Sequence, residues 1–153
     1  MLFRSAAEVD IFSNGRLRLG VGVGWKEQEF DALGVDFHSR GRLIEEQVSL
    51  LKELWTKEKV NYSGTFHVLK NIGINLLPIQ QPIPIWMGGS ADRVLRRAAR
   101  LADDWITDQA VSKDLNRYIG KVWNYLDQFE KDKHDFKIIK YLQTGKIPRS
   151  EWL

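Results

Sequence analysis

A chain of 153 residues with a formal net charge of +3 can form one domain with a buried core, and it is only mildly basic. Its composition, 43% hydrophobic and 28% charged, is that of a folded globular protein and excludes a disordered tail. The absence of cysteine excludes disulfides, thiolate metal sites and a cysteine nucleophile.

The first strand of the chain is predicted at residues 17–24, after a helix that ends near residue 12 and a turn at residues 13–15. Glycine alternates through this strand, at positions 20, 22 and 24, so one face has no side chains and leaves room for a flat ligand or a close neighbour. Trp25 could form a wall of that space, although a core tryptophan is the commoner case. The spacing does not fit the G-x-G-x-x-G fingerprint of dinucleotide-binding folds.

The middle of the chain predicts a helix over about residues 40–55, whose apolar residues recur at helical spacing. A small hairpin follows at residues 60–68, with its turn at Ser63-Gly64. Residues 71–81 are predicted to form a loop that leads into the next strand.

The segment 82–93 is the most informative part of the sequence. A short apolar strand runs into Gly88 and Gly89, and Ser90 is predicted to be the N-cap of the helix that follows. Glycines let a ligand approach the backbone, and the first amides of a helix are unpaired, so this junction suits a phosphate. A plain strand-to-helix turn explains the same residues about as well, because Asp92 suits the helix dipole without any ligand.

The helix after this junction carries the densest basic cluster, Arg93, Arg96, Arg97 and Arg100, which we interpret as a solvated face and not as a nucleic-acid surface. A short strand at residues 105–107 and a helix capped by Ser112 come next. A strand at residues 136–142 completes the pattern. Strands that alternate with helices predict an α/β fold with a parallel sheet, in a single domain that spans residues 1–153.

No segment of the sequence carries a recognisable catalytic constellation. The three histidines lack metal-ligand spacing, and there is no P-loop or nucleophile elbow, so we expect no metal site and name no catalytic residue. No apolar run approaches the roughly 18 residues of a membrane span, and the first residues are too short for a signal peptide. We therefore expect a soluble, cytoplasmic protein with no membrane or nucleic-acid partner.

Several motifs in the same order resemble the luciferase-like monooxygenase superfamily. The resemblance is carried by residues 15–25, 29–37, 40–42, 81–90 and 96–105, and it is strong over about residues 5–107. It implies a (β/α)8 TIM barrel, of which this chain would be an incomplete barrel with about strands 4 to 7. It also implies a flavin- or deazaflavin-dependent oxidoreductase that uses FMN or coenzyme F420 on a small organic substrate.

The resemblance also implies roles for particular residues in holding the cofactor. Gly88, Gly89 and Ser90 would lie beside its phosphate, and Arg40 or Arg42 would pair with that phosphate unless both are ordinary surface arginines. The strand-end residues Gly22, Gly24 and Trp25 would lie beside the cofactor.

The family's first three strands and its eighth strand have no counterpart, so we expect a truncated form. An open half-barrel exposes two sheet edges and an apolar inner face, which favours homo-oligomers or association through those edges. Two alternatives remain: a non-catalytic half-barrel that serves as a binding or assembly module, and a barrel fragment that binds a phosphate ligand unrelated to flavin.

Overall fold

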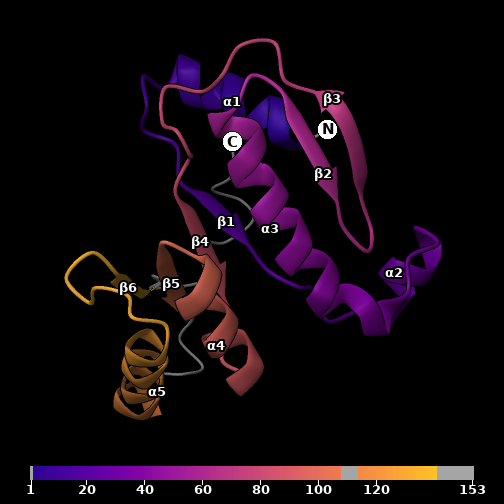
Figure 1. Ribbon diagram of the computed structural model, residues 1–153. Helices are drawn as coiled ribbons and strands as arrows, with labels where there is room; N and C mark the ends of the chain where they lie inside the picture. Colours follow the sequence, from indigo (N-terminus) through magenta and orange to yellow (C-terminus); the bar gives the residue numbers. More distant parts are fainter. Residues whose placement is uncertain (1, 108–113, 141–153) are drawn as a thin grey trace, which may run out of the picture.

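The computed structural model describes residues 2–107 and 114–140, in which one parallel sheet is flanked by helices (Figure 1). The four strands of the sheet follow the order β1-β4-β5-β6, and an antiparallel hairpin, β2-β3, forms a second, separate sheet. The elements are α1 (Leu2–Phe12), β1 (Leu19–Val21), α2 (Glu27–Ala32), the 3-10 helix η1 (Phe37–Ser39), α3 (Arg40–Thr56), β2 (Val60–Ser63), β3 (Val68–Ile72), β4 (Ile85–Gly88), α4 (Asp92–Leu101), β5 (Asp104–Thr107), α5 (Leu115–Gln128) and β6 (Lys137–Lys140).

All four strands of the main sheet run in the same direction, which confirms the predicted α/β class. Helices α4 and α5 connect successive strands, whereas the longer connection from β1 to β4 contains α2, α3 and the hairpin. Within the described residues, β1 pairs only with β4 and β6 only with β5, so the sheet has two free edges. This arrangement places the carboxyl ends of all four strands along one rim.

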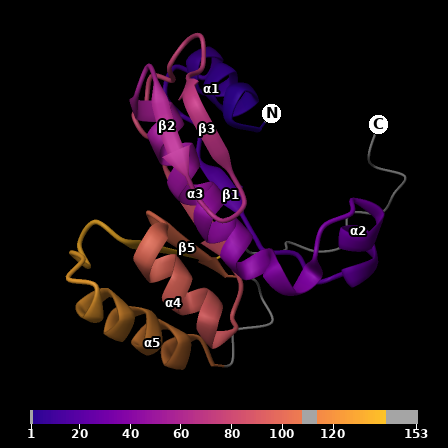
Figure 2. The same cartoon turned by 45° about the vertical axis from the view of Figure 1, so that its right-hand side comes forward.

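One face of the sheet is the main hydrophobic core. Ile85, Met87 and Trp105 are fully buried there, and apolar residues of α1, α3, α4 and α5 pack against them. Figure 2 shows α3, α4 and α5 gathered on the same side of the strands. Burial of this apolar surface is the main driving force that holds the helices on the sheet.

Successive side chains of each strand point alternately to the core face and to the opposite face of the sheet. Gly20, Trp86, Gly88, Ile106 and Ile139 lie there, and none of them belongs to a buried apolar cluster of the described residues. The two buried clusters of the described chain both lie elsewhere, one between sheet and helices and one under the hairpin.

The boundaries of the predicted elements hold for the helices better than for the strands. The helix predicted over 40–55 is α3, but β1 has three residues where eight were predicted, so Gly22 and Gly24 lie after the strand. The second hairpin strand is β3 at 68–72, two residues later than predicted, and it takes up the start of the predicted loop. Ser112 and the last two residues of the predicted strand 136–142 lie outside the described residues.

None of the helices in segments 2–107 and 114–140 combines the length and the apolar character needed to cross a membrane.

Candidate functional site

The rim at the carboxyl ends of the strands brings together β1, β4 and β5. Gly88 is the last residue of β4, and a Cβ atom placed on it would lie 3.4 Å from the Ile106 side chain and 4.0 Å from the carbonyl oxygen of Val21. The strand-end glycine predicted from the sequence therefore lies between the ends of both neighbouring strands. Ligands of parallel α/β sheets bind at this rim.

Gly89 has a backbone conformation that strongly favours glycine. Its φ is +123°, and a Cβ atom there would lie 3.1 Å from Cγ1 of Val94. The indole Nε1 of the buried Trp105 donates a hydrogen bond of 2.8 Å to the Gly89 carbonyl oxygen, which fixes this peptide against the core. Two neighbouring elements thus set the direction in which the backbone leaves β4.

The N-cap of α4 is Ala91 and not Ser90, so this part of the sequence prediction is wrong. Ala91 has the extended conformation of a cap residue, its carbonyl oxygen accepts from the amides of Val94 and Leu95, and no side chain caps the helix. The turn at Gly89 uses one more residue than predicted, which shifts the start of the helix. Ser90 lies between the turn and the cap, where its hydroxyl is not needed to cap α4.

Asp92, in the first turn of α4, connects this helix to α5. Its carboxylate accepts hydrogen bonds from Lys121 Nζ at 2.6 Å and from the Tyr125 hydroxyl at 2.7 Å. These two bonds, that from Lys121 first, hold the pKa of Asp92 below its usual value of 3.8. The carboxylate is therefore engaged by α5 and is largely neutralised by the ammonium group.

The lowered pKa of Asp92 predicts a pH dependence of stability. A carboxyl group whose pKa is lower in the folded than in the unfolded state stabilises the fold above its unfolded pKa, and this stabilisation disappears as the pH falls through the folded value. We expect Asp92→Asn to melt at a lower temperature than the parent chain at pH 7, and the gap to close below pH 3.8. Thermal unfolding followed by circular dichroism measures both. Asp31→Asn is the control, because within the described residues the Asp31 side chain makes no ion pair or hydrogen bond. A gap that stays constant with pH would contradict this account.

The three glycines after the start of β1 differ in their surroundings. Among the described residues, a Cβ atom on Gly20 or Gly22 would meet nothing within 4 Å, so this part of the chain leaves the predicted space beside the strand open at these two positions. Gly24 instead has φ +72°, and a Cβ atom there would lie 3.0 Å from the Phe30 ring. Both the backbone turn and the close approach of Phe30 therefore favour glycine at this position. Trp25 is neither a core residue nor part of the strand: its exposed fraction is 79%, and the Lys26 ammonium lies 5.2 Å from its ring centroid.

The two candidate arginines of α3 contact different parts of the chain. Arg40 stacks on Phe37, with Cζ 3.5 Å from the ring centroid, and donates to the Phe37 carbonyl oxygen at 2.7 Å, while its Nε is buried without a partner in the described residues. Arg42 is exposed and lies 6.0 Å from the ring of Phe66 at the hairpin tip. No recorded contact joins either arginine to segment 88–90 in the described part of the chain.

The basic cluster of α4 is not entirely a solvated face. Arg97 has an exposed fraction of only 7%, and its Nε donates to Glu45 of α3 at 2.9 Å, while Arg100 pairs with the other oxygen of Glu45. The carboxylate thus joins α3 to α4. The helical spacing of these arginines was predicted correctly. The sequence did not indicate that an acidic residue 52 positions before Arg97 would pair with it.

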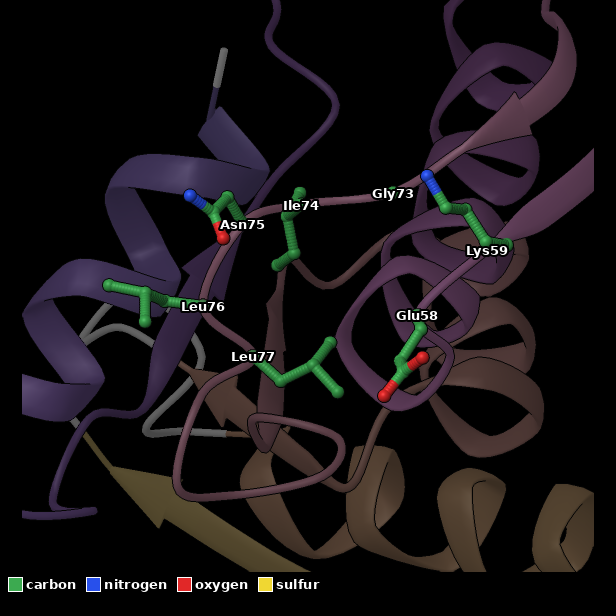
Figure 3. A pocket seen from close by; sticks show the side chains of 7 residues that line it. All are labelled: Glu58, Lys59, Gly73, Ile74, Asn75, Leu76 and Leu77. Atoms are coloured by element: carbon green, nitrogen blue, oxygen red, sulfur yellow. The ribbon is translucent and has the colours of Figure 1, made fainter.

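A hollow of about 600 Å³ lies away from the strand ends. Figure 3 shows Glu58 and Lys59, which follow α3, on one side of it, Asn75 and Leu76 on the opposite side, and Gly73 close to Lys59. None of its lining residues comes from the carboxyl rim of the sheet, so this hollow is separate from the site at the strand ends.

Two residues that support the rim were missed by the sequence analysis. Trp105 was assigned to a strand, and nothing in the sequence indicated that its indole would reach Gly89. Lys121 was an ordinary helix position, although an acidic residue in the first turn of one helix and a lysine on the next are compatible with pairing. In both cases the partner is distant in sequence.

Comparisons with known proteins now add to this geometry. The family described as luciferase-like monooxygenase matches residues 1–144. An uncharacterized protein of Mycobacterium tuberculosis is 33% identical over 122 residues, which are 80% of this chain and 42% of the relative. The F420-dependent glucose-6-phosphate dehydrogenase of Microbacterium testaceum is 33% identical over 79% of this chain and 36% of the relative.

The solved structures agree on the fold. An F420-dependent secondary alcohol dehydrogenase in complex with an F420-acetone adduct superposes with a TM-score of 0.80 at 20% identity, over 91% of this chain and 43% of the other. Monooxygenase RslO1 from Streptomyces bottropensis gives 0.76 at 20% identity, over 90% and 44%. The chain therefore spans about two fifths of the length of these relatives.

Proposed function

This chain belongs to the luciferase-like monooxygenase family, and on that premise we propose that it binds the phosphate group of FMN or of the deazaflavin F420 at the end of β4. In this proposal it forms part of an oxidoreductase or monooxygenase that acts on a small organic substrate by hydride transfer or oxygen activation. The bound cofactor would supply that redox chemistry, and the residues of this chain bind and orient it.

The observation that carries the proposal is the Gly88–Ser90 turn in front of α4. Gly89 has a positive φ and is held by Trp105, so the backbone reaches the helix start without a side chain in the way at position 89. The first amides of α4 have no carbonyl partner within the helix, and the helix dipole is positive at this end. Ser90 adds a hydroxyl beside them. This donor set fits a phosphate.

The charges around the turn are compatible with an anion. Asp92 is the one acidic residue in the first turn of α4, and its carboxylate is bound by Lys121 and Tyr125 of α5. Space for the flat part of the cofactor would be provided beside β1, where positions 20 and 22 are open. Gly24 and Trp25 follow at the strand's end, and Arg40 or Arg42 would approach the phosphate from α3 in the same proposal.

Changing Ser90 to aspartate tests the phosphate assignment. A carboxylate within about 4 Å of a phosphate should weaken binding of FMN or F420 by about 100-fold, because two like charges repel at a partly desolvated site. Ser90→Ala is the matched control and should change affinity only a few-fold, since one neutral hydroxyl is lost. Fluorescence titration with each cofactor measures this, and circular dichroism confirms that both variants fold. Equal affinities of the two variants would remove the assignment.

The same titration separates the remaining candidates. Tighter binding of a simple phosphate ester than of FMN or F420 would favour a phosphate-ligand module, and binding of neither would favour the assembly module. The free edges of β1 and β6 favour association of the chain, and sedimentation at increasing concentration would detect it.

A further inference from the structure

A second cleft lies on the outer side of α3, under the β2-β3 hairpin. Its volume is about 430 Å³, within the range of small-molecule pockets. It is lined by Phe3, Gln47, Leu50, Leu51, Leu54, His67 and Leu69, which come from α1, α3, the hairpin turn and β3. None of these residues belongs to the strand rim, so this cleft is independent of the proposed cofactor site.

Five of the seven residues that line the cleft are apolar. Leu50 and Leu54 belong to the buried cluster beneath the hairpin, and Phe3 and Leu69 pack against that cluster while remaining partly exposed. An apolar molecule would therefore meet aliphatic and aromatic side chains from three elements. The polar lining residues are Gln47 and His67, of which the histidine is held in place by the protein.

His67 is oriented by a fully engaged carboxylate. Glu46 accepts from the amides of Thr65, Phe66 and His67 at 2.7 to 3.1 Å, and from Nδ1 of His67 at 2.9 Å. Burial alone would raise the pKa of Glu46, but these hydrogen bonds, that of His67 first, outweigh burial and lower it. The carboxylate is therefore ionised at neutral pH and accepts a hydrogen bond from the N–H group at Nδ1.

This arrangement fixes which nitrogen of the neutral ring is free. With its proton on Nδ1, the imidazole presents an unshared electron pair at Nε2. No hydrogen bond to Nε2 is recorded in the described part of the chain. The three amides already close the hairpin turn on Glu46, so the turn does not depend on the ring. The carboxylate fixes the ring, and the ring offers a free acceptor beside a cleft lined by leucines. Small-molecule sites have this composition, with mostly apolar walls and a few positioned polar groups.

We propose that this cleft binds a small amphipathic alcohol, whose alkyl or aryl body packs against Leu50, Leu54 and Leu69 and whose hydroxyl group donates to Nε2 of His67. The hydroxyl is the required head group, because Nε2 accepts a hydrogen bond and an ether oxygen has none to donate.

Two isomeric probes of equal size test this assignment on the full chain. 1-Hexanol and 1-methoxypentane differ in that only the alcohol can donate a hydrogen bond. In amide NMR titrations we expect saturable chemical-shift changes for residues around the cleft. The affinity for hexanol should be about fivefold higher than for the ether, which is the usual net contribution of one hydrogen bond. His67→Phe should remove that preference while the ether still binds. Equal affinities of the two probes for the parent chain, or no saturable shift, would overturn the proposal.

A pair of tryptophan substitutions tests the location. Leu69→Trp places an indole in the cleft and should abolish binding of both probes. Val68→Trp is the matched control, because Val68 is the neighbouring residue of β3, is exposed and does not line the cleft. It should bind hexanol as the parent does. Loss of binding in both variants, or in neither, would contradict the location, and the effect of His67→Phe decides the head group independently of whether Leu69→Trp folds.

Discussion

Replacing Gly73 with alanine should lower the free energy of unfolding by about 3 kcal/mol, the upper end of the usual cost of overpacking. A Cβ atom at this position would overlap the carbonyl oxygen and carbon of Glu58, which are main-chain atoms and cannot turn away as a side chain could. The loop 73–77 would have to move away from the segment that follows α3. Urea unfolding followed by circular dichroism measures the loss.

The same substitution at Gly120 provides a control with the opposite sign. Gly120 lies inside α5, and a Cβ atom there would meet none of the described atoms within 4 Å. Alanine should therefore stabilise the chain by about 0.5 to 1 kcal/mol, because glycine loses more backbone entropy in a helix. If the two substitutions changed the free energy of unfolding by similar amounts, the overlap with Glu58 would not be the cause of the effect of Gly73→Ala.

Asp10→Ala should also cost about 3 kcal/mol of unfolding free energy, the usual penalty when a buried hydrogen-bonded charge is lost and its partner is left unpaired. The Asp10 side chain, with an exposed fraction of 0%, accepts from the Gln80 amide at 2.9 Å and from Gln80 Nε2 at 2.6 Å. Gln80 in turn donates to the Leu17 carbonyl oxygen at 2.9 Å. One carboxylate thus ties the end of α1 to the loop before β4 and, through Gln80, to the segment before β1.

Asp10→Asn separates loss of charge from loss of all acceptors. The asparagine oxygen can still accept from the Gln80 amide, so we expect about half the cost of the alanine variant in the same urea experiment. An asparagine variant as unstable as alanine would show that both carboxylate oxygens are required.

The sequence identified the turn at Gly88 and Gly89 because its chemistry is local. A strand, two glycines and a helix start follow one another within a few residues, and each has its own composition. Helix α3 was equally predictable from the sequence, since a stripe of apolar residues over four turns is a strong periodic signal. What remained hidden is the partner of each group: the carboxylate of Glu45 beside Arg97, or the indole of Trp105 beside Gly89.

The predicted strand at residues 17–24 failed for a different reason. Alternating valine and glycine satisfies the period of a strand, but a strand ends where its neighbour stops pairing with it. Only three residues of β1 face β4 in register, from Leu19↔Ile85 to Val21↔Met87. The end of β1 is thus set by another segment of the chain. The Ser90 cap failed for a local reason, because a single left-handed residue can shift a helix start by one position.

In the part of the chain that the structure describes, β1 and β6 are the unpaired edges of the sheet, and their direction restricts the symmetry of any pairing between copies of this chain. When β6 of one copy lies beside β1 of another, all strands continue in the same direction, whereas two β1 strands related by an axis perpendicular to the sheet would run in opposite directions. A two-fold axis parallel to the strands makes both β6-to-β1 contacts at once and closes a ring of eight parallel strands. In that ring both Gly88–Ser90 turns lie on the same rim, so a self-paired molecule would carry two equivalent copies of the proposed phosphate site, which open in the same direction.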